Sequence, residues 1–339
     1  MKSKDIHERL KDIEEFLLKQ YKESKNGEKK RDWRTYEQRL MHRIKEGIKN
    51  LEPLIDEATK VVEVHRGKGR KPDITLKQKV ILILLKELFG KSNRMMASML
   101  SVFSLLSNVD ISYKTVERLY SDPEVEMAIH NLHILVLKKK KGVKLFDVDT
   151  CGDGTGYSLT VRKHYASETR KRKDKVKEAG GKKGNKSKKA FVYSFKMLDI
   201  GTKMYIVAYG TSFRSEKQAF EKAMEMIKDR GINIESIRLD KYYSFPSYVD
   251  MFEDAKVYVI PRKNATLRGS WKWKKTMMEF VHNTLPYLEQ YYLRNNSESG
   301  FSVDKRWFGW GVEQRREDRI NTAMACTDLW HNLFNLYPS

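Results

Sequence analysis

Several features that mark common protein classes are missing from this sequence of 339 residues. Its two cysteines, Cys151 and Cys326, are isolated, with no CxxC pair or Cys/His cluster, which argues against a zinc ribbon and a disulfide scaffold. The longest aliphatic run, Val80 to Leu85, is far too short to span a bilayer. The charged N-terminus, MKSKDIHERL, has no apolar signal core. We therefore expect a cytoplasmic protein with no membrane partner.

Positive charge, by contrast, is in excess. The chain has 67 Lys and Arg against 45 Asp and Glu, a formal net charge of +22. Hydrophobic residues make up 40% of it, which is enough for folded cores in two or three domains. A folded protein this basic is expected to bind a polyanion, most simply nucleic acid. A ribosome-associated protein would have a similar composition.

The N-terminal 62 residues have the pattern of two amphipathic helices. Apolar residues recur at helical spacing over residues 6–18 and again over 40–55, with a break near 24–29. A basic linker follows at 63–74, where glycines, a proline and clustered cations argue against a helix. This linker is either an arm that enters a DNA groove or a solvated connection.

Residues 75–137 are predicted to be all-helical. Thr75 is a candidate helix cap and Gly90 a candidate helix end, with a second helix from Asn93 to about Leu106. A third segment begins at Ser112. Its predicted exposed face, made of Lys114, Thr115 and Arg118, would suit a helix-turn-helix DNA-binding domain, although any small helical bundle gives this pattern.

From residue 143 the hydrophobic period changes, and we place an α/β domain at 143–310 and a C-terminal helix at 311–339. We predict strands at 143–151, 190–198, 204–209, 236–240 and 256–260, and helices at 215–229, 245–252 and from about 285. A meander that passes into strand–helix alternation predicts a mixed sheet flanked by helices. A loop at 162–189 holds 13 Lys or Arg against 3 acidic residues. It is expected to be disordered when free and to contact DNA phosphates.

Candidate metal ligands lie at strand ends and on the last long helix of this domain. The first strand leads into DVDTCGDGTGYSL, which offers Asp147, Asp149 and Asp153. Asp240 ends the fourth strand, and Glu298 lies on the helix. Phosphoryl transfer with two magnesium ions needs carboxylates that converge in this way from separate elements.

Four residues of the last helix share one stripe. Tyr291, Arg294, Glu298 and Lys305 project, at about 100° per residue, from an arc about 60° wide. Such a stripe either holds a metal-bound phosphodiester or is a solvated, charged face.

The same four residues form the pattern Tyr-x2-Arg-x3-Glu-x6-Lys, which resembles the signature of a large group of prokaryotic insertion-sequence DDE transposases. The context DGTGY at 153–157 is similar to the motif around that group's first catalytic Asp, and Asp240, followed by Lys241, is similar to its second. The resemblance covers residues 75–337. It implies an RNase H-like fold for the domain at 143–310.

It further implies that Asp153, with Asp149 as the alternative, acts with Asp240 and Glu298 to hold two divalent ions, Mg²⁺ or Mn²⁺. Arg294, Lys305, Tyr291 and Lys241 would contact DNA. Trp271 and Trp273, among cations, suit stacking on an unpaired base, or else they are core residues near a turn.

The expected activity is metal-dependent cleavage at element ends and transfer of the 3′-hydroxyl into target DNA, by a chain associated with the nucleoid and paired as a homodimer on double-stranded DNA. The alternatives are a related metal nuclease and a transposase-derived, inactive DNA-binding protein.

Overall fold

The computed structural model describes most of the chain. The described residues are 12, 13, 15, 16, 19, 32–63, 74–90, 93–97, 99, 111–142, 148–159, 191–212, 215–262 and 265–337. Four predictions concern residues that lie wholly or mainly outside this set: the first helix with the break after it, the basic linker, the second helix of the 75–137 region, and the basic loop at 162–189.

Helices form the N-terminal part of the described chain. They are α2 (Trp33–Lys49), α3 (Leu51–Lys60), α4 (Leu76–Phe89), α6 (Tyr113–Leu119) and α7 (Pro123–Lys141). The Thr75 hydroxyl accepts from the backbone N–H of Gln78, whose side chain accepts from the N–H of Thr75 in return. Gly90 ends α4 at φ 57°, and Ser112 caps α6, so these predicted boundaries are confirmed.

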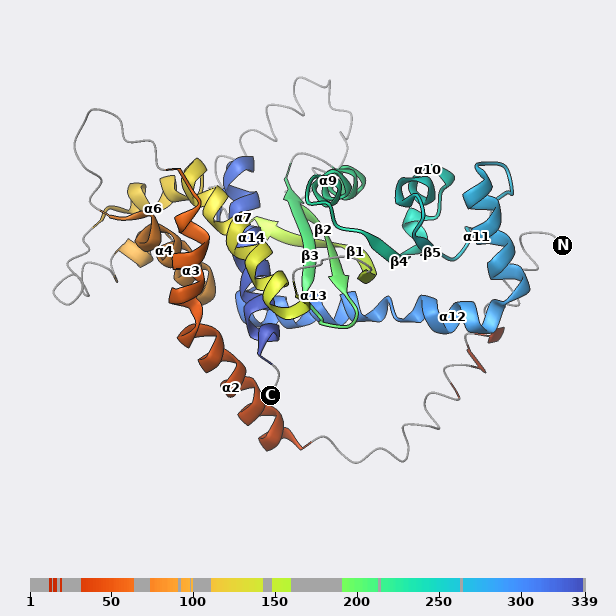
Figure 1. The fold of residues 1–339 in the computed structure, drawn as a ribbon, viewed down its shortest axis with the longest axis horizontal. Helices are drawn as coiled ribbons and strands as arrows, with labels where there is room; N and C mark the ends of the chain where they lie inside the picture. Colours follow the sequence, from red (N-terminus) through yellow and green to blue (C-terminus); the bar gives the residue numbers. More distant parts are fainter. Residues whose placement is uncertain are drawn as a thin grey trace, which may run out of the picture.

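A mixed sheet forms the centre of the molecule (Figure 1). Its strands are β1 (Val148–Leu159), β2 (Phe191–Asp199), β3 (Tyr205–Thr211), β4 (Ile234–Leu239), β5 (Lys256–Tyr258) and the short β6 (Gly311–Val312). The order is β3-β2-β1-β4-β5, and β6 pairs with the end of β1. β2 runs antiparallel to both of its neighbours, β1 and β3, whereas β4 and β5 run parallel to β1. This sheet and its flanking helices confirm the predicted fold class and are consistent with an RNase H-like core.

The remaining helices cover the two faces of the sheet and its edges (Figure 1). They are α9 (Glu216–Asp229), α10 (Pro246–Val249), α11 (Trp271–His282), α12 (Thr284–Tyr292), α13 (Asn295–Phe308) and α14 (Glu317–Leu336), with 3₁₀ turns η1 (Lys241–Tyr243) and η2 (Asp250–Phe252). α9 packs on one face, and α13 crosses the other with α12 nearly in line with it.

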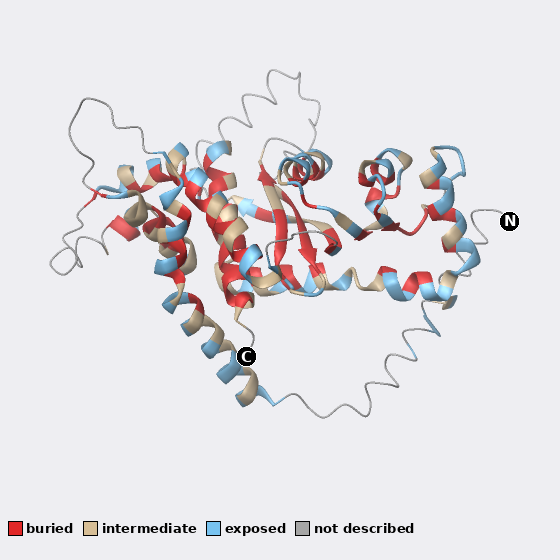
Figure 2. Cartoon of the chain, viewed as in Figure 1, coloured by how far each residue is buried: buried red, intermediate tan, exposed pale blue. Residues whose placement is uncertain are grey.

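One hydrophobic core extends from the N-terminal helices into the sheet (Figure 2). Helix α14 makes this connection, because it packs against β3, α7 and α4. Its Trp330 is fully buried, and the indole N–H donates to the carbonyl of Leu84 at 2.7 Å. The predicted division into separate domains remains a prediction. No helix in the described ranges is long and apolar enough to cross a membrane.

The first strand differs from its prediction. β1 runs from Val148 to Leu159, so Asp153 lies inside the strand and not at its end. The two glycines that flank Asp153 allow close packing. A Cβ at Gly152 would lie 2.6 Å from the Phe195 ring, and one at Gly154 would lie 2.1 Å from the Glu216 carboxylate.

The C-terminal helices also differ from their prediction. No helix was predicted over residues 271–282, but Ser270 caps α11 there by accepting from the N–H of Trp273. The single helix expected from about 285 is two helices. Between them the backbone tightens into i→i+3 hydrogen bonds, from Arg294 N–H to the Tyr291 carbonyl and from Ser297 N–H to the Arg294 carbonyl.

Candidate active site

Strand β1 presents alternate residues to the helix that crosses it. Side chains two apart on a strand share one face, and Asp153, Thr155 and Tyr157 all face α13: Arg294 pairs with the first, and Lys305 contacts the other two. Gly154, between them, faces α9. In the DGTGY segment, Asp153, Thr155 and Tyr157 therefore point toward α13, whereas Gly154 packs closely against α9 on the opposite face of the strand.

Three carboxylates from three separate elements converge on one nitrogen, and we refer to these residues as the carboxylate centre. Arg294 Nη1 lies 3.1 Å from Asp153 Oδ2 on β1, 3.3 Å from Asp240 Oδ2 after β4, and 3.0 Å from Glu298 Oε1 on α13. Asp240 is held by its own turn, because its carboxylate accepts from the backbone N–H of Tyr242 at 2.8 Å. The structure thus brings the predicted Asp153, Asp240 and Glu298 together.

The carboxylate centre is rich in negative charge and open on one side. The side chains of Asp153, Asp240 and Glu298 are 15%, 36% and 56% exposed, so the centre runs from the protein interior to its surface. Burial raises the pKa of Asp153 to about 6, although Arg294 opposes this shift. Burial lowers the pKa of Arg294, but Tyr291 and the three carboxylates outweigh it, so the net shift is upward.

The carboxylate centre has the donor chemistry of a magnesium or manganese site. Its oxygens are hard ligands of the kind these ions prefer. In the described residues, no three His, Cys, Asp or Glu side chains are arranged as ligands of a single ion. The physical reason is that the oxygens surround a guanidinium nitrogen at 3.0–3.3 Å, whereas magnesium needs about 2.0–2.1 Å. Metal binding would require Arg294 to withdraw and the carboxylates to close.

Asp149, the alternative first carboxylate, is engaged elsewhere. Its Oδ1 lies 3.0 Å from Arg238 Nη1 and also accepts from the hydroxyl of Ser236. Burial raises its pKa, but these two partners outweigh burial, so the net shift is downward. Arg238 is 1% exposed and also binds Gln290 of α12, through Nη2 to Oε1 at 2.8 Å. The arrangement is that of a structural ion pair, and Arg238 is a residue that sequence reasoning missed.

Tyr291 supports Arg294 from the protein interior. It is 4% exposed and packs in a small apolar cluster with residues such as Tyr258 and Phe280. The Arg294 guanidinium carbon lies 5.8 Å from the centre of its ring, and burial raises the pKa of Tyr291 to about 12. The ring of Tyr291 is thus buried in this structure, and its expected contact with DNA remains a prediction.

Lys305 lies along the same face of β1, beyond Asp153. Its Nζ donates to Thr155 Oγ1 at 2.8 Å and lies 5.3 Å from the ring centre of Tyr157 and 5.0 Å from that of Trp310. Burial lowers the pKa of Lys305. Lys241, the other predicted DNA contact, follows Asp240 directly and is partly exposed.

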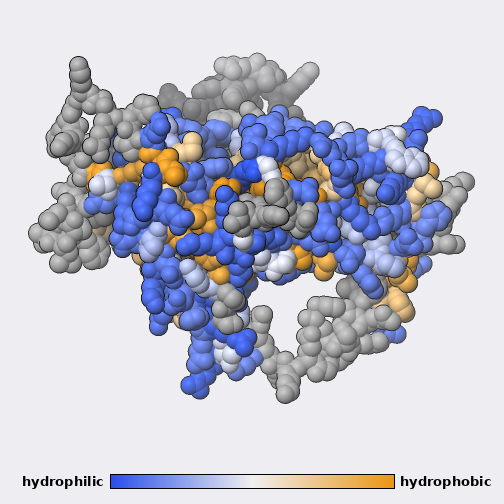
Figure 3. Space-filling view, viewed as in Figure 1, coloured by the Kyte–Doolittle hydropathy of each residue, from blue (hydrophilic) through white to orange (hydrophobic). Residues whose placement is uncertain are grey.

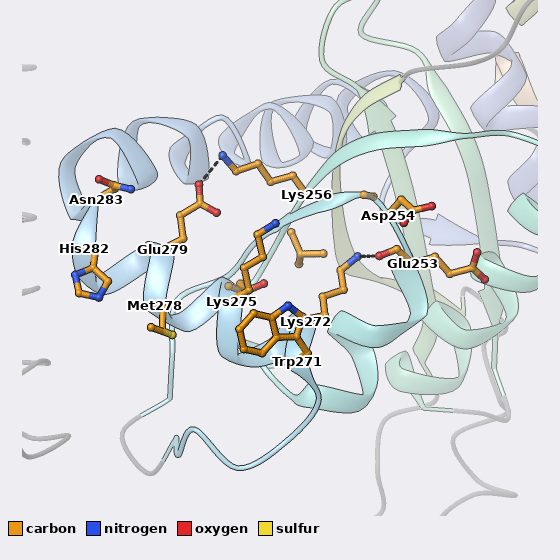
Figure 4. Close-up of a pocket in the computed structure, with 13 residues that line it drawn as sticks. Glu253, Asp254, Lys256, Trp271, Lys272, Lys275, Met278, Glu279, His282 and Asn283 are labelled. Carbon is orange, nitrogen blue, oxygen red and sulfur yellow. Dashed lines mark hydrogen bonds and ion pairs between the residues drawn. The ribbon is translucent and has the colours of Figure 1, made fainter.

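The two tryptophans have different environments. Trp271 is 76% exposed and lines a cavity of about 920 Å³ with Lys272 and Lys275 (Figure 4). Trp273 is 2% exposed, and its indole N–H donates to the Thr266 carbonyl at 2.8 Å. For Trp273 the structure corrects the stacking expectation and supports the core alternative, because a side chain at this spacing on α11 points inward. The cavity contains none of the three carboxylates.

A second group of charged residues, which sequence reasoning missed, lies on the same face of the sheet, and we refer to it as the lysine cluster. Lys196 of β2 is fully buried and binds Asp304 of α13 at 2.9 Å and Asp328 of α14. Asp304 also accepts from the Tyr205 hydroxyl at 2.8 Å and lies 2.7 Å from His331 Nδ1. These contacts fasten α13 to the sheet and to α14. The only signal in the sequence was a lysine within an apolar strand.

The mixed sheet and the converging carboxylates define the class: an RNase H-like α/β protein with a three-carboxylate centre. No family model matches the chain. It is similar to the probable transposase of the insertion sequence element ISA1214 from Archaeoglobus fulgidus, with 44% identity over 292 residues that cover 86% of this chain and 84% of the relative. The chain therefore belongs to the insertion-sequence transposase family.

Proposed function

We propose that the chain is a DDE-type transposase, which cuts DNA at the ends of its element and joins the 3′ ends to target DNA. The observation that carries the proposal is the convergence of Asp153, Asp240 and Glu298, from β1, β4 and α13, on one nitrogen of Arg294. Family membership and the Tyr-x2-Arg-x3-Glu-x6-Lys pattern support the same reaction class. Double-stranded DNA is the proposed partner, bound by a homodimer in the nucleoid, and the net charge of +22 favours it.

Asp153, Asp240 and Glu298 are the residues that would hold the divalent ions. Bound magnesium supplies activation of a water or 3′-hydroxyl and stabilisation of the leaving oxygen. Asp153 is the most buried of the three carboxylates and Glu298 the most exposed. The scissile phosphate would therefore approach from the side of Glu298 and α13. Burial raises the pKa of Asp153 to about 6, so metal binding below that pH would have to displace a proton from this carboxyl.

Arg294 and Lys305 provide positive charge beside this position. The guanidinium can pass from carboxylate oxygens to phosphate oxygens, since both accept from the same planar donors. The Nε of Arg294 is buried without a hydrogen-bond partner, so its N–H can donate to a phosphate oxygen. Lys305 contributes a point charge further along β1.

The test is magnesium-dependent nicking of a duplex that carries an end of the element flanking the gene. Asp153→Asn, Asp240→Asn and Glu298→Gln should each lower the nicking rate at least about 1000-fold, since each removes a charged metal ligand, while leaving gel-shift affinity for DNA nearly unchanged. Asp149→Asn is the matched control, because this carboxylate pairs with Arg238. Loss in Asp149→Asn with full activity in Asp153→Asn would reverse the assignment of the first carboxylate.

Products separate the remaining alternatives. Joining of the cleaved 3′ end to a second duplex identifies a transposase, and nicking without joining identifies a metal nuclease. DNA binding by the wild type with no cleavage in magnesium or manganese would identify an inactive DNA-binding protein and overturn the proposal.

A further inference from the structure

Strand β1 lies between two helices, and the carboxylate centre occupies only its α13 side. Helix α9 covers the opposite side (Figure 1). Ser215 and Gln218 form a capping box at the start of α9, so that Glu216 is the first residue of this helix. The Glu216 carboxylate fills the space in which a side chain at Gly154 would lie. Glu216 therefore contacts β1 at the residue that follows Asp153, a proposed metal ligand.

The same carboxylate holds the turn that follows β4. Tyr243, the last residue of η1, donates from its hydroxyl to Glu216 Oε1 at 2.8 Å. The turn begins at Asp240, whose carbonyl accepts from the N–H of Tyr243 at 2.9 Å and whose carboxylate accepts from the N–H of Tyr242. The side chain of Tyr243 is thus bonded to Glu216 and its backbone to Asp240. Two hydrogen bonds therefore link Glu216 to a second proposed metal ligand.

The ring of Tyr243 is held in a buried cluster of aromatic residues. Its ring centre lies 5.5 Å from that of Phe195, 4.9 Å from that of Phe220 and 6.0 Å from that of Tyr248. Tyr243 is fully buried, whereas the described residues on the molecular face in Figure 3 are mainly hydrophilic. Protein interiors are close-packed, so a ring in this cluster has little room to shift. The Tyr243 hydroxyl is therefore a rigid point of attachment for Glu216.

The pairing of β1 with β4 ends just before the two carboxylates that a metal ion would share. The last paired residues are Gly152 and Leu239, so Asp153 and Asp240 each lie one residue beyond the β1–β4 ladder. Magnesium requires near-ideal octahedral geometry with ligands at about 2.0–2.1 Å, which makes the distance between these carboxylates critical. Glu216 bridges the two segments from behind the sheet at this level.

We propose that Glu216, acting through the Tyr243 hydroxyl, is a positioning residue that sets Asp240 relative to Asp153 for metal binding. The inference rests on the proposed function, because it takes these two carboxylates as metal ligands. Glu216 is not itself a ligand, since it lies on the face of β1 opposite to Asp153. The alternative is that the contact between Glu216 and Tyr243 only stabilises the fold.

Two tyrosines of the aromatic cluster provide a matched test. Tyr243→Phe removes the hydroxyl that donates to Glu216, whereas Tyr248→Phe removes a hydroxyl that is buried without a hydrogen-bond partner among the described residues. The dissociation constant for Mn²⁺ is measured by electron paramagnetic resonance on the full-length protein without DNA. It should rise about 10–100-fold in Tyr243→Phe and stay within about 2-fold of wild type in Tyr248→Phe. Equal Mn²⁺ affinities in the two variants would overturn the positioning role.

A further variant separates this test from that of the proposed function. Asp153→Asn should weaken Mn²⁺ binding at least as much as Tyr243→Phe, since it removes a charged ligand. If it does so while Tyr243→Phe binds like wild type, the metal site stands and only the positioning role fails. If Asp153→Asn binds Mn²⁺ as tightly as wild type, the proposed metal site fails, and the positioning role fails with it.

The magnesium dependence of nicking gives a second measurement. Tyr243→Phe should raise the Mg²⁺ concentration for half-maximal nicking about 10-fold or more, with a smaller change in the rate at saturating Mg²⁺. A contact that only stabilises the fold would leave that concentration unchanged in the folded protein. An unchanged concentration would therefore assign the contact between Glu216 and Tyr243 to stability alone.

Substitutions of Glu216 separate its hydrogen bond from its charge. Glu216→Gln keeps a side-chain oxygen that can accept from Tyr243, so its Mn²⁺ affinity should stay within about 3-fold of wild type. Glu216→Ala removes the acceptor and should weaken Mn²⁺ binding about 10–100-fold. Equal losses in the two variants would assign the effect to the charge of Glu216 and exclude positioning through the hydroxyl.

Two glycines on one face of β1 test the contact from the other segment. Gly154→Ala would place a Cβ on the Glu216 carboxylate and displace it from Tyr243, so it should weaken Mn²⁺ binding as much as Glu216→Ala. Gly156→Ala is the matched control, because a Cβ there meets no described atom within 4 Å. The double variant of Gly154→Ala with Glu216→Ala should bind no more weakly than either single variant, since each removes the same interaction. Additive losses would show that the two residues act separately and would overturn the proposal.

Discussion

Helix α13 carries charged residues into two clusters that differ in how far their charges are balanced. In the lysine cluster, Lys196 lies between two carboxylates in a fully buried site, with a tyrosine hydroxyl and a histidine as further partners. In the carboxylate centre, three carboxylates share one guanidinium at a site open to solvent. The lysine cluster holds strands and helices together. The carboxylate centre has more carboxylates than its one guanidinium can neutralise, so a metal ion could bind there in place of Arg294.

The β1–β2 register makes this difference sharper. Lys196 lies directly opposite Asp153 across the two strands, so both residues start from the same face of the sheet. The lysine nonetheless turns to Asp304 and Asp328. Lys196 is therefore already occupied by two carboxylates, and Arg294 is the cation that the described structure places among the three carboxylates of the centre.

The largest stability effect is expected where charge is buried and matched. Asp304→Asn should lower the free energy of unfolding by about 3–5 kcal/mol, because it removes the charged partner of His331 and leaves buried Lys196 with Asp328 as its one ion-pair partner in the described structure. Glu298→Gln is the matched control on the same helix, and as a 56% exposed side chain it should change stability by less than about 1 kcal/mol. Denaturant titration of both variants measures the contrast, and equal losses would show that the two clusters do not differ in kind.

A smaller effect, on catalysis, is expected at the cation of the open cluster. Arg294→Lys should lower the rate of DNA nicking about 10–100-fold, because an ammonium cannot reproduce the planar, multi-point contact of a guanidinium with phosphate. Unfolding should change little, since the lysine keeps the positive charge among the carboxylates. Nicking at the wild-type rate would remove Arg294 from the proposed machinery.

The pH dependence of stability should have opposite signs for Asp153 of the carboxylate centre and Asp304 of the lysine cluster. The pKa of Asp153 is raised, so its neutral form is favoured by folding, and its contribution to stability is lost as pH rises from about 4 through 6. Asp304 behaves in the opposite way. Burial raises its pKa, but Lys196 and His331 outweigh burial, so its stabilising contribution is lost as pH falls below the unfolded value.

Asp153→Asn should accordingly gain stability over wild type on going from pH 4 to pH 8, by about 1–3 kcal/mol in metal-free buffer. Thermal or denaturant unfolding in EDTA at the two pH values measures this gain. A difference that shrinks as pH rises would mean that Arg294, and not burial, dominates the ionisation of Asp153.

The smallest effect is expected at the edge of the centre. Lys305→Gln should reduce the slope of log K against log salt for DNA binding by about 0.9, the value for one lost phosphate contact. Thr155→Val removes the hydroxyl that now accepts from Lys305 and should leave the slope unchanged. If the two variants alter stability alike and neither alters the slope, Lys305 serves only to hold Thr155.

Local chemistry allowed much of the fold to be predicted from the sequence. Alternating apolar residues gave the hairpin of β2 and β3, and the boundaries of α4 follow from the Thr75 cap and Gly90. The fixed offsets between Arg294, Glu298 and Lys305 likewise predicted a helix, and α13 begins directly after Arg294. In each case the signal lies within a few residues, where backbone propensity and side-chain period act directly.

Only the tertiary structure decided which charges meet. Asp149 and Asp153 have the same strand period, but their partners differ. Asp149 pairs with Arg238, 89 residues away in sequence, and Asp153 pairs with Arg294. Trp271 and Trp273 lie among the same cations, yet packing of α11 buries one and exposes the other. Lys196 pairs with Asp304 and not with Asp153, and Asp328 of α14 is its second partner at that site. Which charged residues pair and which tryptophan is buried depends on desolvation and on contacts between residues far apart in sequence. Neither produces a periodic pattern or a fixed spacing that could be recognised in the sequence.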